Sequence, residues 1–340
     1  MKIAFEANVL TFPHTGIAKS LIHLIRHIKD AEVILFTSNG RKIDIGFECI
    51  RLDSGGGSQN LAPLASCDYL HYHQNGGILP NFANNILMLH DVLPLILDRN
   101  PLRNLAYKRY TKSQIKLAQT ILTPSLYSKT QILRYFKVDK EIHVLPHGVE
   151  KVEAPSKTKG DYYIYVGGYD PRKGLDNLLE TFIRLKKKII FVGEIRYFSR
   201  HFEALAKRAM SLGISTQSGY VSEIRLRELI KNAKALIYPS KFEGFGLPPL
   251  ESMALGTPVI TTPFSSIKEI CKECALYFDP DIKDSLYKTI ISFESSDIKE
   301  KLIKAGLENA KDYSWEKTAR EYMGILHELQ NTRKSHNPHK

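Results

Sequence analysis

The sequence is poor in cysteine and contains no long apolar run. Four cysteines among 340 residues are too few for a disulfide-stapled fold and are typical of a reducing compartment. The longest apolar stretch, residues 86–97, is interrupted by His90 and Asp91 and is shorter than the roughly 18 residues of a membrane span. The first residues enter a strand pattern directly, without the apolar core and cleavage site of a signal peptide. These absences predict a cytoplasmic protein.

Motifs with the spacing of metal ligands are also sparse. Cys271 and Cys274 form one C-x-x-C pair, but no second pair or flanking histidine accompanies it, so it does not predict a zinc or redox site. His71 and His73 alternate along a predicted strand, residues 68–73, and share one of its faces. No third ligand stands out, and polar positions at a strand end explain the two histidines better. We therefore predict no bound metal and no cofactor.

Positive charge is plentiful and unevenly distributed. The formal net charge is +12, and residues 99–137 contain nine basic residues and no acidic one. Such a segment favours an anionic partner, either a phospholipid surface or nucleic acid, although a solvated helix face explains it about equally well. The nine residues are Arg99, Arg103, Lys108, Arg109, Lys112, Lys116, Lys129, Arg134 and Lys137.

The pattern of apolar runs indicates two α/β domains. At about 150 residues per domain the chain is long enough for two, and short apolar strands alternate with amphipathic helices in both halves. The polar segment 150–159 has a proline and no periodicity, which is typical of a linker. We predict a first domain over residues 1–150, a second over 151–312, a terminal helix over 313–330 and a disordered tail over 331–340.

One stretch, residues 238–262 (YPSKFEGFGLPPLESMALGTPVITT), combines the elements of a ligand-binding crossover. A short strand is followed by a glycine loop, a helix and a second strand. Backbone N–H groups at the start of that helix, near Gly246 and Leu247, suit an anion such as phosphate. Glu243 and Glu251 lie on either side of this turn and are suited to accept hydrogen bonds from hydroxyls. A ligand with hydroxyls on both sides of a diphosphate is a nucleotide-sugar.

Two further glycine loops each connect a strand to a helix. Gly16 precedes an amphipathic helix and lets the backbone approach a ligand closely, although an ordinary turn would also use it. In the second half, Gly167 and Gly168 are followed by Arg172 and Lys173. The guanidinium can bind phosphate oxygens with two N–H groups, and the ammonium supplies a point charge. Both loops are therefore candidates for phosphate binding.

A histidine follows a predicted strand in the first half. His90 comes directly after residues 86–89, at the carboxyl end of the strand, where ligands bind in α/β sheets. Its imidazole is suited to donate a hydrogen bond to a hydroxyl or to help move a proton. A plain hydrogen bond to a loop carbonyl is the alternative.

These motifs resemble those of a known family. EGFGLPPLE followed by MALGTPVI is similar to the signature of the retaining glycosyltransferases of family 4, or glycosyl transferases group 1, and the similarity extends from the GIAKS loop to the SWEKTARE helix. The resemblance implies the α/β fold called GT-B, with two Rossmann-like doubly wound domains that face each other across a cleft. It also implies that the terminal helix crosses back to the first domain.

The resemblance assigns roles to the residues near the reacting bond. LMLHDVLPL is similar to a family segment whose histidine, here His90, lies against the donor sugar. YVGGYDPRKGLDNLLETF is similar to the diphosphate-binding segment, in which Arg172 and Lys173 would neutralise the leaving group. Some members carry a further arginine where Gly167 or Gly168 stands, and this chain lacks it. Retention of configuration is implied as well.

Further roles concern the rest of the donor. By the same resemblance, Glu243 would orient the sugar hydroxyls and Glu251 would accept from the ribose hydroxyls. Tyr220 and Val221 would flank the nucleobase, and the loop at Gly16 would close over the diphosphate. Because cations already serve the phosphates, a divalent metal is not required.

We therefore predict a retaining hexosyltransferase. It would move a hexose from a nucleotide-diphosphate sugar, with mannose on GDP favoured and UDP nearly as plausible, to a glycan or lipid-linked acceptor in cell-envelope polysaccharide synthesis. The basic segment 99–137 would allow peripheral attachment to the inner membrane face. The alternatives are a GT-B nucleotide-sugar epimerase, a phosphorylase-type enzyme with pyridoxal phosphate on a lysine, and a nucleic-acid-binding protein. The glutamates and glycine loops argue against nucleic acid as the partner.

Overall fold

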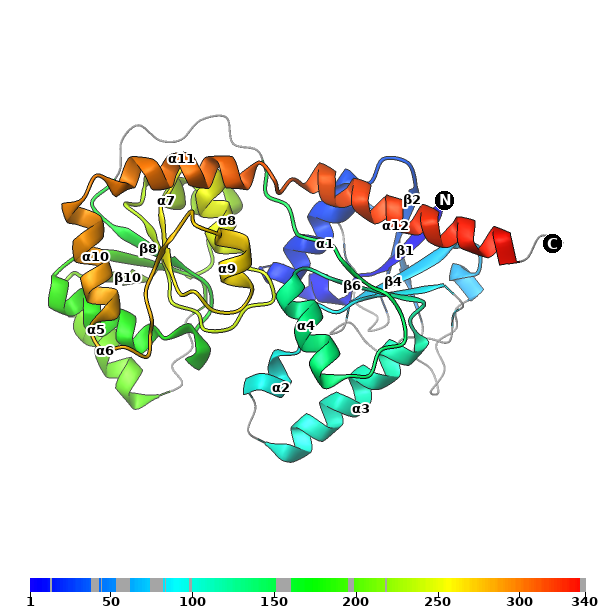
Figure 1. Cartoon of the computed structure of the whole chain (residues 1–340), viewed down its shortest axis with the longest axis horizontal. Coiled ribbons are helices and arrows are strands. Elements are labelled where there is room, and N and C mark those ends of the chain that lie inside the picture. The colour runs from blue at the N-terminus through cyan, green and yellow to red at the C-terminus, as the bar shows by residue number, and fades with distance from the viewer. Residues whose placement is uncertain are drawn as a thin grey trace. The chain divides into compact units, whose positions relative to one another are not determined.

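The computed structural model contains two parallel β-sheets, one in each of two compact units (Figure 1). The first unit consists of Met1–Gly148 and Trp315–Lys340, and the second of Val149–Ser314. The predicted linker lies outside the described residues, except for Glu150. The structure describes residues 1–12, 14–37, 43, 45–52, 62–73, 82, 84–97, 100–150, 160–194, 199–217 and 219–336.

The first unit is built on a seven-stranded sheet. The strand order is β3-β2-β1-β4-β5-β6-β7, so the direction of the order reverses between β1 and β4. In parallel sheets such a reversal opens a crevice at the carboxyl ends of the two strands. The strands are β1 (Lys2–Glu6), β2 (Glu32–Thr37), β3 (Cys49–Arg51), β4 (Tyr69–His73), β5 (Asn85–Met88), β6 (Thr120–Thr123) and β7 (Ile142–Val144).

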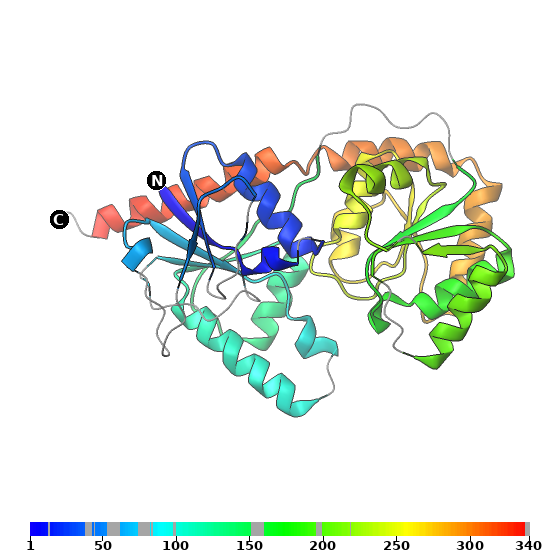
Figure 2. The same ribbon diagram turned by 180° about the vertical axis from the view of Figure 1, so that it is seen from behind.

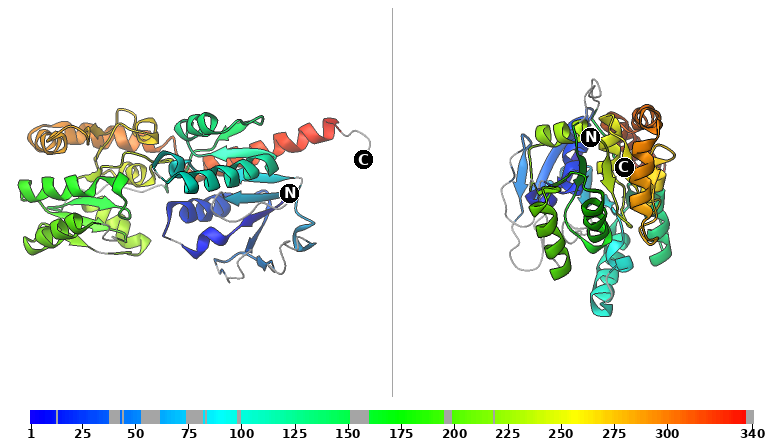
Figure 3. Two further views of the ribbon diagram at one scale, coloured as in Figure 1. Left: turned by 90° about the horizontal axis from the view of Figure 1, so that it is seen from below. Right: turned by 90° about the vertical axis from the view of Figure 1, so that its left-hand side faces the viewer.

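The two faces of this sheet pack into separate hydrophobic cores, because successive side chains of a strand point in opposite directions. Phe5 of β1 packs with α1 (Gly16–His27) and α12 (Trp315–His336), which lie side by side (Figures 1 and 2). Its neighbour Ala4 packs in the core that includes side chains of α3 (Pro101–Leu117) and α4 (Leu126–Tyr135). Figure 3 shows α3 and α4 on the other side of the sheet from α1. Shorter elements are η1 (Asn8–Thr11), η3 (Ala62–Leu64) and α2 (Leu93–Leu97).

The second unit has a six-stranded sheet with one core cluster. Its order is β10-β9-β8-β11-β12-β13, which reverses between β8 and β11. The strands are β8 (Tyr163–Val166), β9 (Ile189–Val192), β10 (Ser215–Gln217), β11 (Leu236–Tyr238), β12 (Val259–Thr261) and β13 (Leu276–Tyr277). The helices are η4 (Pro171–Lys173), α5 (Leu175–Leu185), α6 (Arg200–Ser211), α7 (Glu223–Asn232), α8 (Leu247–Ala254), α9 (Ser266–Cys271), α10 (Ser285–Ser295) and α11 (Ile298–Ala310).

The predicted α/β class with two Rossmann-like doubly wound sheets is confirmed. One prediction about the carboxyl terminus is wrong: the helix that was expected to end at residue 330 continues to His336 as α12, so the first six residues of the predicted tail are helical. The helix can continue beyond Leu326 because no proline or glycine interrupts the sequence before Asn337.

Candidate functional site

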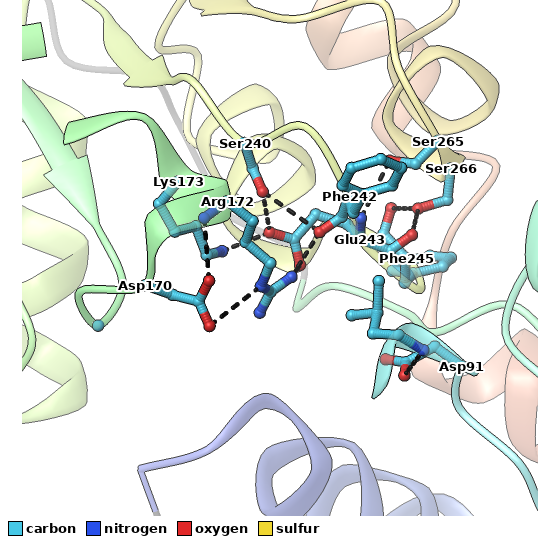
Figure 4. A network of polar contacts seen from close by, with 12 residues as sticks. Asp91, Asp170, Arg172, Lys173, Ser240, Phe242, Glu243, Phe245, Ser265 and Ser266 are labelled. Atoms are coloured by element: carbon cyan, nitrogen blue, oxygen red, sulfur yellow. Dashed lines mark hydrogen bonds and ion pairs between the residues drawn. The ribbon is translucent and has the colours of Figure 1, made fainter. Parts of the chain in front are cut away.

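The loop after β8 holds two cations in fixed positions. The side chain of Asp170 accepts a hydrogen bond from the backbone N–H of Arg172 (3.0 Å) and so caps the short helix η4. Gly174, in the left-handed conformation with φ of 60°, ends η4 and begins α5. This turn places the side chains of Arg172 and Lys173 beside the loop that follows β11 (Figure 4).

Both cations contact one carboxylate. The ammonium of Lys173 hydrogen-bonds to Oε1 of Glu243, and Nη1 of Arg172 lies 3.2 Å from Oε2 of the same group. Ser240 donates a hydrogen bond to Oε1 over 2.6 Å, and the hydroxyl of Tyr238 lies 3.0 Å from Oε1 and 2.8 Å from the ammonium of Lys173. Figure 4 shows Lys173, Arg172 and Ser240 converging on Glu243. The cluster lies where the order of the second sheet reverses, between β8 and β11.

Burial and charge act against each other in this cluster. Burial lowers the pKa of Lys173, and the carboxylate of Glu243 opposes the effect. Burial alone would raise the pKa of Glu243, but the cations of Lys173 and Arg172 together hold it below its usual range. Glu243 is therefore ionised at neutral pH, and two cations share one buried carboxylate.

The helix start after Glu243 offers fewer N–H groups than the sequence interpretation assumed. Gly246 has φ of 117°, which favours glycine, and α8 begins at Leu247. The next two residues are Pro248 and Pro249, which have no backbone N–H. Of the first three helical residues, only Leu247 can donate to an anion. Glu251 lies one turn further along α8 and is partly buried.

Four further glycines of the second unit lie in loops at neighbouring strand ends: Gly167, Gly168, Gly193 and Gly219. The N–H of Gly193, after β9, donates to the carbonyl of Gly219, which precedes α7, over 2.8 Å. A Cβ atom on Gly193 would lie 2.6 Å from the carbonyl oxygen of Gly167, so these two loops approach closely. Gly168 accepts a hydrogen bond from the hydroxyl of Tyr165 (2.8 Å). The loops containing Gly167, Gly168, Tyr220 and Val221 thus all lie at the carboxyl edge of β8, β9 and β10.

In the first unit, Gly16 is the first residue of α1, as predicted, and Thr15 caps the helix by accepting from the N–H of Ala18. His90 lies two residues beyond β5, and 7% of its surface is exposed. Among the described residues its ring bonds His73 and no loop carbonyl: Nε2 lies 3.0 Å from Nδ1 of His73, and the two rings are stacked. Burial lowers the pKa of His90 to about 4, so its imidazole is neutral at pH 7.

Four buried residues of possible chemical importance were missed by the sequence interpretation. Tyr238 and Ser240 had a signal, since both lie within five positions of Glu243. His73 was interpreted as a polar position at a strand end rather than a metal ligand, and the structure pairs it with His90. Glu6, at the end of β1, is 1% exposed, and burial raises the pKa of its carboxyl to about 8. In the described part of the chain, no group of three or more His, Cys, Asp or Glu side chains is placed to hold a metal ion.

The basic segment forms an exposed surface. In α3 the basic side chains are exposed, and so are Leu102 (77%) and Leu105 (47%). Arg99 lies outside the described residues. Within the described ranges, no helix combines the length and the hydropathy needed to cross a bilayer.

The residues of the site lie within a segment that matches a known family. Residues 149–310, which include Arg172, Lys173 and Glu243, match the family described as Glycosyl transferases group 1. The matched segment covers just under half of the chain. The chain has the GT-B fold, as the sequence motifs predicted. A solved sucrose-phosphate synthase from Thermosynechococcus elongatus superposes with a TM-score of 0.75 at 17% identity, covering 98% of this chain and 100% of that one.

Two relatives have a higher sequence identity to this chain than the sucrose-phosphate synthase has. The O-antigen chain mannosyltransferase RfbU of Salmonella typhimurium is 29% identical over 228 residues, which cover 64% of this chain and 62% of that protein. The O-antigen chain mannosyltransferase B of Escherichia coli is 25% identical over 272 residues, covering 73% and 71%. The chain thus spans less than two thirds of the length of the Salmonella relative.

Proposed function

We propose that the protein is a retaining hexosyltransferase that moves mannose from GDP-mannose to a glycan or lipid-linked acceptor in cell-envelope polysaccharide synthesis. The observation that carries the proposal is the contact of Lys173 and Arg172 with Glu243 at the reversal point of the second sheet. The names of the two O-antigen chain mannosyltransferases support the sugar and the type of product. A UDP-linked hexose is the alternative donor.

Arg172 and Lys173 would bind the diphosphate of the donor. Together they carry two positive charges against the single charge of Glu243. Asp170, 3.5 Å from Nε of Arg172, brings the formal charge of the four groups to zero, but its side chain is 46% exposed and solvent screens it, so the buried groups keep a net attraction for an anion. Preorganised cations stabilise the charge that develops on a departing diphosphate. The N–H of Leu247 and the backbone at Gly246 would add to this, but the side-chain cations do most of the work because two prolines follow.

The first role of Glu243 is to hold neighbouring side chains in place. Its Oε1 already accepts from Lys173 and Ser240, whereas its Oε2 has the guanidinium of Arg172 as partner. The carboxylate therefore positions both cations, and a sugar hydroxyl would reach it through the remaining lone pairs of Oε2. This role adds to the one predicted from the sequence.

The remaining contacts would hold the nucleoside and the sugar. We assign the ribose hydroxyls to Glu251 and the nucleobase to Tyr220 and Val221, whose loop is fixed to β9 through Gly219 and Gly193. The flexible backbone at Gly16 and at Gly167 and Gly168 would approach the phosphates.

His90 would hydrogen-bond to a hydroxyl of the donor sugar as a neutral imidazole. Burial lowers its pKa, so the ring carries one proton at neutral pH and can donate one hydrogen bond. The acceptor hydroxyl would attack the anomeric carbon on the face of the departing diphosphate: the new C–O bond forms as the bond to the phosphate oxygen breaks, and the hydroxyl proton passes to that oxygen. Neither a metal nor a cofactor is required for this step.

The basic face of α3 would dock on an anionic membrane surface, which would bring the protein to a lipid-linked acceptor from the cytoplasmic side. Its exposed lysines and arginines supply the charge, and Leu102 and Leu105 supply apolar contact. The triple variant Lys108→Glu, Arg109→Glu, Lys112→Glu should no longer sediment with phosphatidylglycerol vesicles. A control with Lys299, Lys301 and Lys304 of α11 changed to Glu carries the same change of charge and should still sediment.

The activity is tested by incubating the protein with GDP-mannose and with a set of UDP-hexoses, each with and without a membrane glycolipid extract. We expect release of GDP from GDP-mannose that depends on the extract, with an α- or β-linkage that matches the donor. Conversion of the donor without an acceptor would indicate an epimerase instead. Failure to consume or bind any nucleotide-sugar would refute the proposal.

A further inference from the structure

The first unit contains a small cavity beside His73, whose ring contacts His90. Its walls come from β4, β5, α1, α12 and the segment after β7, and include His71, His73, His147, Ser20, Trp315 and Thr318. The volume is about 10 Å³, which is close to the minimum that one water molecule needs. A cavity of this size holds water only where polar groups line it, and this one is lined by three imidazoles and two hydroxyls.

Two of the imidazole nitrogens lack a protein partner. His71 is fully buried and His73 is 2% exposed, and in the described part of the chain no group hydrogen-bonds to Nε2 of either ring. Buried polar atoms are nearly always hydrogen-bonded to protein or to ordered water. Since both residues line the same cavity, one water molecule can serve both nitrogens.

The hydroxyls on the cavity wall can only accept from such a water. Ser20 donates its hydrogen to the carbonyl of Ile17 (2.8 Å), and Thr318 donates to the carbonyl of Pro146 (2.7 Å). Their hydrogens are therefore directed away from the histidines, so they do not compete as donors to Nε2 of His71 or His73.

A tyrosine of α12 fixes the proton of the first histidine. The hydroxyl of Tyr322 lies 3.1 Å from Nδ1 of His71, and both side chains are fully buried. Burial keeps this phenol protonated and lowers the pKa of His71 to about 3, so a neutral phenol meets a neutral imidazole. A buried O–H group with one partner satisfies its hydrogen by donating to that partner. His71 thus accepts at Nδ1 and carries its own proton at Nε2, the nitrogen that has no hydrogen-bond partner among the described residues.

We propose that one water molecule in this cavity accepts from Nε2–H of His71 and donates to Nε2 of His73, so that Nδ1–H of His73 donates to Nε2 of His90. The chain of donors then runs in one direction from Tyr322 to His90. His90 must carry its proton on Nδ1, because its Nε2 accepts. Tyr322, His71 and His73 are positioning residues, and they act on the donor sugar through His90.

The direction of this chain decides what His90 offers to a ligand. In the proposed direction Nδ1 is a hydrogen-bond donor, which suits an oxygen lone pair of a sugar hydroxyl. In the reverse direction Nδ1 would be an acceptor only. No described residue hydrogen-bonds to Nδ1 of His90, so this nitrogen is the one left for a ligand. The inference rests on the proposed function only in naming the sugar as that ligand.

The protonation pattern is tested directly by nitrogen-15 NMR of the full chain with labelled histidines, at pH 7.5 and without substrate. The signals are assigned through single histidine variants. We expect the proton on Nδ1 in His90 and His73 and on Nε2 in His71. A proton on Nε2 of His90, or on Nδ1 of His71, would overturn the proposal. Because no substrate is present, this result is independent of whether the protein transfers mannose.

Two phenylalanine variants test the effect on turnover. Tyr322→Phe keeps the buried ring and removes the first donor of the chain. Tyr69→Phe is the matched control, since its hydroxyl donates to the carbonyl of Leu326 in the same core and lies outside the chain. We expect Tyr322→Phe to lower kcat about fivefold, the scale of one neutral hydrogen bond, with the KM of the donor changed less than twofold. Equal kcat values in the two variants would contradict the proposal.

A second pair of variants separates a hydrogen-bonding role of His73 from a packing role. The side-chain amide of His73→Asn can replace the Nδ1–H donor to His90, whereas His73→Leu offers no donor. We expect the Asn variant to keep the Nδ1 proton of His90 and most of kcat, and the Leu variant to lose both. The same His90 signal in the two folded variants would show that His73 only fills space. Should neither variant fold, the wild-type NMR pattern still decides.

Discussion

The buried ammonium of Lys173 hydrogen-bonds to the carboxylate of Glu243, which lies 70 positions later in the chain. The contact joins the loops after β8 and β11, the two strands between which the order of the second sheet reverses. The contact therefore brings two separate sequence motifs together in one site. In this site one carboxylate fixes two cations at the edge of the sheet where ligands bind in α/β folds.

Removing either partner should affect activity and stability together. We expect Lys173→Ala and Glu243→Ala to lower kcat/KM at least ~100-fold, the scale of one lost transition-state donor. Glu243→Ala should also lower the free energy of unfolding by about 3 kcal/mol, because Lys173 is left buried without a carboxylate. Lys173→Ala should cost less stability, because Glu243 keeps its contact with Arg172. Steady-state kinetics and urea unfolding measure the two effects.

The control for this pair is Lys241→Ala. Lys241 lies two residues before Glu243 and pairs with Asp281, but that pair is exposed. Exposed ion pairs contribute little, so the variant should stay within about 1 kcal/mol and about threefold of wild type. If Lys241→Ala and Lys173→Ala lose the same activity, the assignment of the site is wrong.

Tyr238→Phe should weaken the site without emptying it. The variant removes the hydroxyl that lies 2.8 Å from the ammonium of Lys173 and 3.0 Å from Glu243, and it keeps the ring, whose centroid is 4.6 Å from the ammonium. We expect kcat/KM to fall about tenfold and the free energy of unfolding by about 1 kcal/mol. Tyr163 lies in the neighbouring strand β8, and its hydroxyl donates to Glu294. Tyr163→Phe removes this hydrogen bond and should cost similar stability, but it should leave kcat/KM unchanged.

Gly193→Ala should disrupt the contact between the loops after β8 and β9, which we propose to lie at the donor. Its Cβ atom would lie 2.6 Å from the carbonyl oxygen of Gly167, and the residue has φ of 127°. We expect a loss of about 3 kcal/mol in the free energy of unfolding together with weaker nucleotide binding. Gly213→Ala has a positive φ of 66° as well, but open space around it, and should cost only about 1 kcal/mol. Equal losses would mean that the close approach does not matter.

The stability of the protein should fall between pH 6.5 and pH 5. Burial lowers the pKa of His71 to about 3 and of His90 to about 4, and it lowers those of His73 and His147 as well. As the pH falls below 6.5, the unfolded chain takes up protons that the folded chain does not, so each such histidine costs about 1.4 kcal/mol per pH unit in this window. Urea midpoints measured across the window test this, and a flat profile would contradict it.

Glu6 opposes this trend, because burial raises its pKa to about 8. Its contribution is fully present below the unfolded pKa of about 4.5 and is lost as the pH rises toward 8. Glu6→Gln, which cannot titrate, should be more stable than wild type at pH 8, and the difference should shrink as the pH approaches 5. The fall between pH 6.5 and pH 5 should accordingly become steeper. If the difference between the two proteins does not depend on pH, the buried carboxyl titrates normally.

The sequence located the loops of the site because glycine, proline and charge mark them. The strands that begin or end near Arg172, Glu243 and His90 were found from short apolar runs. β10 was not found, since Ser215–Gln217 is polar and its strand conformation depends on pairing with β9 at the edge of the sheet. Local patterns report helices and buried strands, whereas short edge strands depend on tertiary contacts.

The contacts within the site could not be predicted from the sequence. The carboxylate of Glu243 was expected to face a sugar, but strand order brings it to Lys173 and Arg172. His73 and His90 meet because β4 pairs with β5 in a register that sets His73 opposite Met88. Such pairings between elements distant in sequence are not encoded in the spacing of either one.

The most direct test of the central claim is the affinity of GDP, measured by calorimetry, for the wild-type protein and for the Lys173→Ala and Lys241→Ala variants. The account predicts that wild type and Lys241→Ala bind GDP equally and that Lys173→Ala binds it at least ~10-fold more weakly, because a buried cation that contacts the diphosphate is lost. Equal affinity in all three proteins would contradict it.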